Sequence, residues 1–177
     1  MSDLKNDIIE QTLEIIRSGG AVSFDSVAAR VGLTKPGLMH HFRTKEELMI
    51  ALVDSVAEGM KAGMERLLGR ELLETSPSDR ISAYVEACLE LDHDPADLAM
   101  FGDSRLRDRL IKRWGMHVDN WFEGIADLGA DERGMLAAAR MIGDGLWFAS
   151  ATGVGMPDRE EREVIRVTVK KLIGSES

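Results

Sequence analysis

Apolar residues recur at steps of three and four positions along most of this chain, and no stretch of useful length alternates between apolar and polar residues. That periodicity is typical of amphipathic helices, whereas a half-buried strand would show a period of two. The helices predicted in this way cover residues 4–18, 24–31, 35–42, 44–68, 79–91, a short segment ending at 101, 104–128, 131–151 and 158–173. The sequence therefore predicts an all-α fold of about nine helices.

The first three predicted helices are short and closely spaced. Ser23 and Thr34 suit the N-caps of the second and third helices, because their hydroxyl groups can accept a hydrogen bond from a free backbone N–H. Pro36 fits the first turn of the third helix, and Gly32 supplies the backbone freedom of a sharp turn. Residues 44–47 form a capping box that opens the long fourth helix. This arrangement predicts a helix-turn-helix, whose second helix enters the major groove of DNA.

The run LTKPGLMHHFRTKEEL, residues 33–48, resembles the signature of the TetR family of transcriptional repressors. That signature has a capping Ser or Thr, a hydrophobic residue, a Tyr, a His or Tyr followed by Phe, and then Lys, an acidic residue and Leu after a polar turn. Met39 stands where the family usually has the Tyr, which binds a DNA phosphate. The resemblance implies an N-terminal DNA-binding domain (residues 1–47) and a C-terminal helical domain (residues 48–177) for effector binding and dimerisation.

The DNA contacts are expected on the exposed face of the third helix and on the residues that flank it. Leu38 and Phe42 are four positions apart and should face the small core instead. Lys35 could contact a guanine or a phosphate, and both options stay open. The predicted DNA-binding residues are Thr34, Lys35, Pro36, Gly37, Met39, His40, His41 and Lys45. The alternative is a helical hairpin with no role in DNA binding.

The charge of the chain argues against a broad basic DNA-binding surface. The formal net charge is −9, and residues 1–48 hold six Lys and Arg residues against seven Asp and Glu residues. DNA binding must therefore depend on a few cations and on helix N-termini aimed at phosphates. We expect an affinity that is strongly salt-dependent, and that is modest without specific base contacts.

Aromatic residues gather in the second half of the chain. Members of the TetR family usually bind an inducer among their middle helices, so the resemblance implies a ligand pocket here. The predicted ligand-binding residues are Met100, Phe101, Trp114, His117, Trp121, Met141 and Trp147. For any one of them, ordinary packing between helices explains the residue about as well. Asp119 and Asp144 would suit a cationic effector if they faced inward, and they would be solvated otherwise.

The remaining chemistry of the chain is sparse. No Gly-rich phosphate loop, metal quartet or nucleophile beside a base is visible, so neither an enzyme nor a bound cofactor is predicted. Asp92, His93 and Asp94 have the composition of a metal site, but acidic residues before a helix more often cap it. His40 and His41 are adjacent and would point about 100° apart, so they are not expected to share a metal ion.

The single cysteine, Cys88, excludes an intramolecular disulfide and suits a reducing cytoplasm. The N-terminus does not resemble a signal peptide. The longest apolar stretch, residues 135–156, is interrupted by Arg140 and Asp144, so no membrane span is predicted. A cytoplasmic protein is expected.

The last two long helices are rich in small and apolar residues. The resemblance implies that they pair with their copies in a four-helix dimer interface, and an intramolecular bundle is the alternative. The sequence thus predicts a homodimeric, ligand-responsive repressor that binds a palindromic DNA operator. The repressor would leave the operator when it binds a small hydrophobic or aromatic effector, which could also be cationic. The competing hypothesis is a helical small-molecule-binding protein whose DNA binding is weak or lost.

Overall fold

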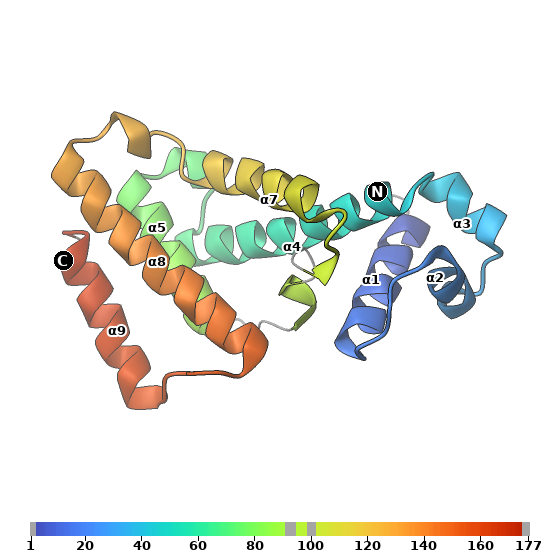
Figure 1. Cartoon of the computed structure of the whole chain (residues 1–177). Coiled ribbons are helices and arrows are strands. Elements are labelled where there is room, and N and C mark those ends of the chain that lie inside the picture. Colours follow the sequence, from blue (N-terminus) through green and yellow to red (C-terminus); the bar gives the residue numbers. More distant parts are fainter. Residues whose placement is uncertain (1–2, 91–94, 99–101, 175–177) are drawn as a thin grey trace. The chain divides into compact units, whose positions relative to one another are not determined.

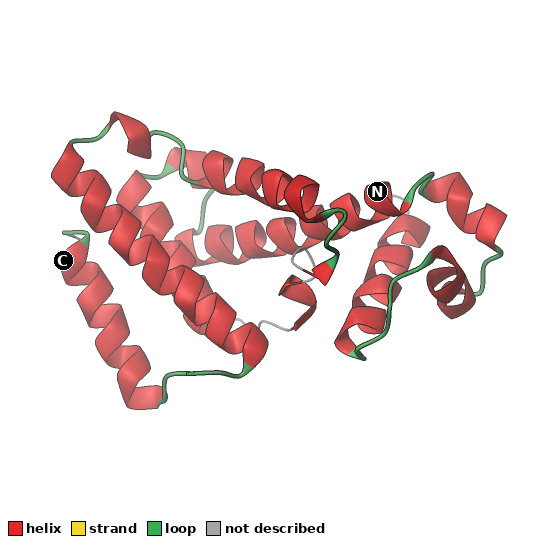
Figure 2. Ribbon diagram, in the orientation of Figure 1, coloured by secondary structure: helices red, strands yellow, loops and turns green. Residues whose placement is uncertain are grey.

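The computed structural model describes residues 3–90, 95–98 and 102–174. Over these residues the regular structure consists of eight α-helices and three short 3₁₀-helices, with no strand (Figure 2). The elements in chain order (Figure 1) are α1 (Asp3–Arg17), α2 (Phe24–Val31), α3 (Lys35–His41), α4 (Lys45–Leu68), η1 (Leu72–Glu74), α5 (Pro77–Glu90), η2 (Pro95–Leu98), α7 (Arg107–Trp121), η3 (Ile125–Asp127), α8 (Ala130–Thr152) and α9 (Arg159–Leu172). The predicted all-α fold is confirmed. No helix in the described part of the chain is long and apolar enough to cross a membrane.

The chain forms two compact units. The first unit comprises residues 1–57 and 94–115, and the second comprises residues 58–93 and 116–177. The helix-turn-helix lies wholly in the first unit, together with the first halves of α4 and α7. The division between DNA-binding and effector domains at residue 47 stays a prediction.

A small apolar core holds the first unit together. Ile8 of α1, Val27 of α2, Leu38 of α3 and Leu48 of α4 are all fully buried in it. Phe42, which follows α3, is 5% exposed and belongs to the same core. Burying one such side chain contributes about 1.5–3 kcal/mol. The prediction that Leu38 and Phe42 face inward is confirmed.

Local signals set the boundaries of these helices as predicted. Ser23 and Ser26 form a reciprocal capping box at the start of α2, and Gly32 ends α2 with a φ of +71°. The hydroxyl of Thr34 accepts a hydrogen bond from the N–H of Gly37 at the start of α3. The predicted box at residues 44–47 is only half formed, because the carboxylate of Glu47 accepts from the N–H of Arg43 rather than from that of Thr44.

The predicted helix over residues 104–128 is wrong at both ends. Its apolar stripe looked continuous, but Asp103 holds a turn in which its carboxylate accepts from the N–H of Arg105, and α7 begins only at Arg107. At the other end α7 stops at Trp121, and Gly124 has a φ of +87°, which no helix accommodates. Near the end of α4, Leu67 is 42% exposed, so it does not belong to the buried face of that helix. The predicted short helix ends at Phe101, which lies outside the described residues.

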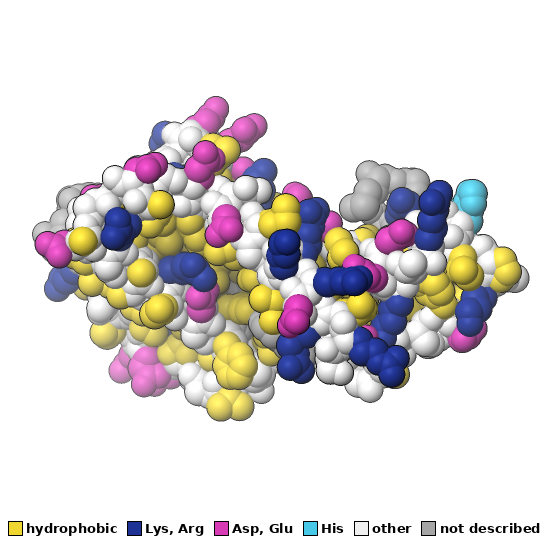
Figure 3. Space-filling view, turned by 45° about the horizontal axis from the view of Figure 1, so that its top comes forward, with side chains coloured by type: hydrophobic (Ala, Val, Ile, Leu, Met, Phe, Trp, Pro, Cys, Tyr) yellow, Lys and Arg dark blue, Asp and Glu magenta, His cyan; other side chains and the backbone are white. Residues whose placement is uncertain are grey.

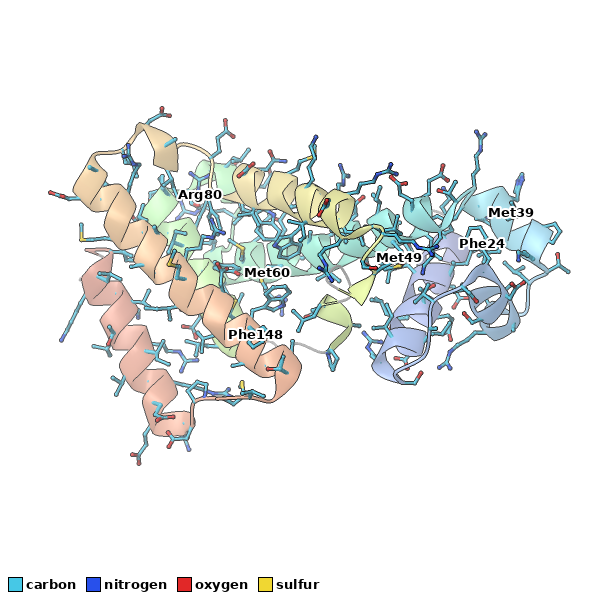
Figure 4. All side chains as sticks on the ribbon, viewed as in Figure 1. Phe24, Met39, Met49, Met60, Arg80 and Phe148 are labelled. Carbon is cyan, nitrogen blue, oxygen red and sulfur yellow. The ribbon has the colours of Figure 1, made fainter. Side chains whose placement is uncertain are left out.

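A buried arginine stabilises the end of α7. Arg80 of α5 is 5% exposed, and its guanidinium donates hydrogen bonds to the carbonyl oxygens of Trp121 (3.3 Å) and Glu123 (2.8 Å) (Figure 4). Burial lowers its pKa. A cation at the C-terminus of a helix is favoured by the helix dipole and satisfies carbonyl groups that have no partner in the helix.

Helices α5 and α8 pack closely in the second unit, because α8 has no side chain at Gly143. The ring of Tyr84 lies against that glycine, and a Cβ added there would come within 2.6 Å of the ring carbon Cε1. The hydroxyl of Tyr84 donates a hydrogen bond of 2.7 Å to the carboxylate of Asp144. One turn along α5, burial raises the pKa of the Cys88 thiol to about 12, so this thiol stays protonated and inert.

This contact predicts the effect of one added methyl group. Gly143→Ala should lower the free energy of unfolding by about 1–3 kcal/mol, because the new Cβ overlaps a buried ring. Urea denaturation measures the change. Gly134→Ala on the same helix is the control, since nothing lies within 4 Å of its added Cβ, and it should be neutral or stabilising. Equal effects of the two substitutions would contradict the close packing of Tyr84 on α8.

Candidate nucleic-acid interface and ligand pocket

The helix-turn-helix presents one side of α3 outward. The seven residues of α3 are anchored by Leu38, which is fully buried. Lys35, Pro36 and His40 are exposed, and Met39 is 44% exposed (Figure 4). Gly37 and His41 are half-buried. The predicted DNA-binding residues therefore lie together, on α3, at its N-cap Thr34 and at Lys45, the first residue of α4.

Thr34 and Gly37 act together as a cap. The Thr34 hydroxyl accepts a hydrogen bond from the N–H of Gly37, and its own O–H can still donate to another group. A Cβ at Gly37 would lie 3.3 Å from that hydroxyl oxygen, which is closer than most such contacts. The glycine, which has no side chain, lets the cap close, and it leaves the exposed side of α3 with few side chains.

Both predicted DNA-binding lysines are paired with carboxylates. The ammonium of Lys35 lies 2.9 Å from the carboxylate of Asp25 on α2, and that of Lys45 lies 2.8 Å from Asp103. The hydrogen bond from Lys45 holds the pKa of Asp103 below its usual range. A DNA phosphate would therefore replace an internal carboxylate as the partner of each lysine. Sequence reasoning missed these pairs, and Asp103 is too far along the chain from Lys45 for any local pattern to reveal it.

Two further ion pairs join the first half of α4 to α7 within the first unit. Arg109 pairs with Glu46, and Arg113 pairs with Asp54 at 2.6 Å. The hydrogen bonds from Arg113 to Asp54 raise the pKa of Arg113. Together with the Lys45–Asp103 pair, they tie the start of α4 to residues 103–113 by charge.

The two adjacent histidines on α3 find no third metal ligand within the described part of the chain. The rings of His40 and His41 are 5.6 Å apart and nearly perpendicular. Among the described residues no group of three His, Cys, Asp or Glu could hold a metal ion. Asp92, His93 and Asp94 lie outside the described residues.

None of the described residues predicted to bind a ligand lines the pocket of about 340 Å³ in the second unit, and their role in ligand binding stays a prediction. Trp121 and Trp147 are buried, Trp114 and His117 are half-buried, and Met141 is 70% exposed. The rings of His117 and Trp121 are 6.4 Å apart. Trp114 belongs to the first unit, whereas His117, Trp121, Met141 and Trp147 belong to the second. Met100 and Phe101 lie outside the described residues.

A pocket of about 340 Å³ does exist in the second unit, lined by other residues. Its apolar wall comes from α5, α7, η3 and α8, and includes Ile81, Val118, Phe122, Ile125 and Leu136. Three charged residues, Asp119, Glu123 and Arg140, also line it. The guanidinium of Arg140 lies 6.0 Å from the centre of the Phe122 ring and 3.5 Å from the carboxylate of Asp144.

The sequence left open whether Asp119 and Asp144 face an effector or solvent, and Asp119 is exposed at this pocket. Asp119 was considered for a cationic effector and does line it, whereas Asp144 is engaged by Tyr84 and Arg140. Ile81 and Leu136 carry no signal that separates them from ordinary core residues. Their helices are far apart in the sequence, and only the fold brings them together.

The capped helix-turn-helix on an all-helical chain defines a DNA-binding transcriptional regulator. Residues 8–52 match the family model described as "Bacterial regulatory proteins, tetR family". Residues 78–174 match the model described as "Tetracyclin repressor-like, C-terminal domain". The chain belongs to the TetR family.

Two relatives add detail. The HTH-type transcriptional activator FasR of Mycolicibacterium smegmatis is 27% identical over 130 residues, which make up 71% of this chain and 58% of FasR. In fold, the chain resembles the crystal structure of SCO7518 from Streptomyces coelicolor A3(2), with a TM-score of 0.58 at 17% identity over 96% of this chain and 98% of that one.

The ion pairs of the first unit predict the effect of removing Lys45. Lys45→Ala should weaken binding to all DNA sequences alike, and it should make the plot of log affinity against log salt concentration less steep by about 0.9 for each protomer bound. Fluorescence anisotropy with labelled duplexes at several salt concentrations measures both. Lys61→Ala, which removes a lysine paired with Glu65 later on α4, is the control. An unchanged salt dependence would remove Lys45 from the phosphate contacts.

Proposed function

We propose that this protein is a ligand-responsive repressor that binds a palindromic operator as a homodimer and is released by a small hydrophobic or aromatic effector. The observation that carries the proposal is the exposed side of α3, which is held in place by the burial of Leu38, by the cap at Thr34 and by the turn at Gly32 that ends α2. Such a rigid, outward-facing short helix is what a major-groove reader needs.

The groove-facing side of α3 offers few contacts to each half-site. Lys35 can donate to guanine or to a phosphate, Met39 can pack on a thymine methyl group, and His40 can donate or accept. Gly37 adds no side chain. Specific binding to DNA usually needs more contacts than one such helix provides, so two copies are required.

The outer faces of α8 and α9 support a homodimer. The inner face of α8 is buried in the second unit by Leu136, Leu146 and other apolar residues. Its outer face carries Phe148, which is 53% exposed, and Met141. On α9, Val164 and Val167 are 64% and 51% exposed. Figure 3 shows apolar side chains gathered on the surface of the second unit between scattered charges. Exposed apolar surface of this kind marks a protein interface.

The pocket of the second unit supports a ligand-binding role. Its volume of about 340 Å³ falls within the range of small-molecule sites, and most of its lining residues are apolar, with Phe122 supplying an aromatic ring. Asp119 and Glu123 give it two carboxylates against the single guanidinium of Arg140, which is already paired with Asp144. An aromatic effector with a cationic group suits this lining. To release DNA, the effector must bind the non-binding conformation more tightly.

The direction of regulation is a separate part of the proposal. FasR is named an activator, and a helix-turn-helix can serve either role according to where its operator lies relative to the promoter. A reporter gene behind the selected operator, with and without the protein, tests the direction. We expect the protein to repress the reporter. Increased transcription would instead show that the protein is an activator, and it would not contradict operator binding.

Selection of DNA from a random library by the purified protein tests operator binding itself. An inverted repeat should be enriched, with half-sites about 10 bp or a multiple apart. Retention of no particular sequence at low and at physiological salt would favour the competing hypothesis, a helical ligand-binding protein without DNA recognition.

The exposed faces of α8 and α9 predict one substitution that breaks the dimer. Val164→Glu places a charge on the apolar face and should convert a dimer into a monomer at micromolar concentration. Sedimentation equilibrium measures the mass. Leu73→Glu is a matched control, because Leu73 is also 64% exposed but lies outside α8 and α9. A wild-type protein that is already monomeric, or a Val164→Glu variant that stays dimeric, would contradict this interface.

The lining of the pocket predicts a preference for positive charge. Benzyltrimethylammonium should bind more tightly than benzoate, and Asp119→Asn should reduce that preference by up to about fivefold, because Asp119 is exposed and screened by solvent. NMR titration measures the two affinities. Asp127→Asn, an exposed aspartate of η3 outside the pocket lining, should leave the preference unchanged. Equal effects of the two substitutions would exclude Asp119 from ligand binding.

A further inference from the structure

An exposed ion pair joins the two helices of the helix-turn-helix. Asp25 is the second residue of α2, Lys35 is the first residue of α3, and their charged atoms are 2.9 Å apart. The two side chains are 73% and 52% exposed. Ion pairs as exposed as this one contribute little to stability. Folding therefore does not explain why the pair is present.

Capping does not explain Asp25 either. The start of α2 is already satisfied, because Ser23 and Ser26 bond each other's backbone N–H groups. The first turn of α3 carries no acidic residue, and its cap is Thr34. The helix dipole favours Asp25 in the first turn of α2, but the same exposed carboxylate repels phosphates and weakens non-specific binding to DNA.

A carboxylate beside DNA is favourable only where it meets a hydrogen-bond donor. In the major groove such donors are the exocyclic amino groups of cytosine and adenine, and Asp or Glu accepts from cytosine N4. Lysine is the complementary reader, since it donates to O6 and N7 of guanine. A Lys and an Asp held together therefore present the donor and the acceptor that a G·C pair requires.

We propose that Asp25 and Lys35 read a G·C pair, or two adjacent pairs, as one unit, with Lys35 donating to guanine and Asp25 accepting from cytosine. This inference rests on the operator binding proposed above. The ion pair orients both groups before DNA arrives. Asp25 also weakens binding to a site with thymine in place of cytosine, because its carboxylate and thymine O4 are both hydrogen-bond acceptors and repel each other.

Selection of DNA by the wild type and by three variants tests the proposal. The wild type should prefer cytosine at one position of each half-site by roughly 5- to 100-fold. Asp25→Ala should abolish that preference and leave the other positions unchanged. Asp25→Asn should shift it toward adenine, because an amide pairs with N6 and N7 of adenine. Lys35→Ala should abolish the guanine preference at the same or the adjacent pair.

Asp7→Asn is the matched control, since it removes a negative charge from an exposed position on α1 of the same unit. If Asp25→Ala and Asp25→Asn only strengthen binding to every sequence, as the control does, Asp25 is an electrostatic residue and the inference is overturned. If the wild type selects no sequence, operator binding itself fails. Circular dichroism establishes whether each variant is folded. If Asp25→Ala does not fold, the base preference of the isosteric Asp25→Asn variant decides whether Asp25 reads cytosine.

Discussion

The burial of Leu38 against the first two helices and the start of α4 is the contact on which the reading helix depends. A helix of seven residues is too short to be stable alone. Leu38, Val27 and Ile8 are all fully buried, so α3 is held by apolar packing with a cap at each end. The same packing decides which residues of α3 face outward. The base contacts proposed for α3 are thus set by packing inside the first unit.

Charge then determines how firmly that helix can bind DNA. Lys35 and Lys45 each have a carboxylate partner, so DNA phosphates and bases must compete with Asp25 and Asp103. In the proposed operator complex, each of these lysines would exchange its carboxylate partner for a group on DNA. The proposal therefore relies on specific contacts and on a second copy, and it gives the exposed faces of α8 and α9 the same weight as α3.

The parts of the fold that were predictable from sequence are those fixed by local chemistry. Ser23, Gly32 and Thr34 act within one turn of their own positions, and the helices that they delimit were predicted correctly. The long helix predicted over residues 104–128 failed because apolar spacing says nothing of the turn at Asp103 or of the break at Gly124. The pocket and the ion pairs of α4 join residues far apart in the chain, so no local pattern reveals them.

A footprint of the protein on its selected operator tests the central claim most directly, that α3 reads the major groove as one of two copies. Methylation of guanine N7 reports on contacts in that groove. We predict two protected patches per operator, related by inverted symmetry and centred about 10 bp or a multiple apart. A single patch, or binding with no guanine protected, would contradict the account.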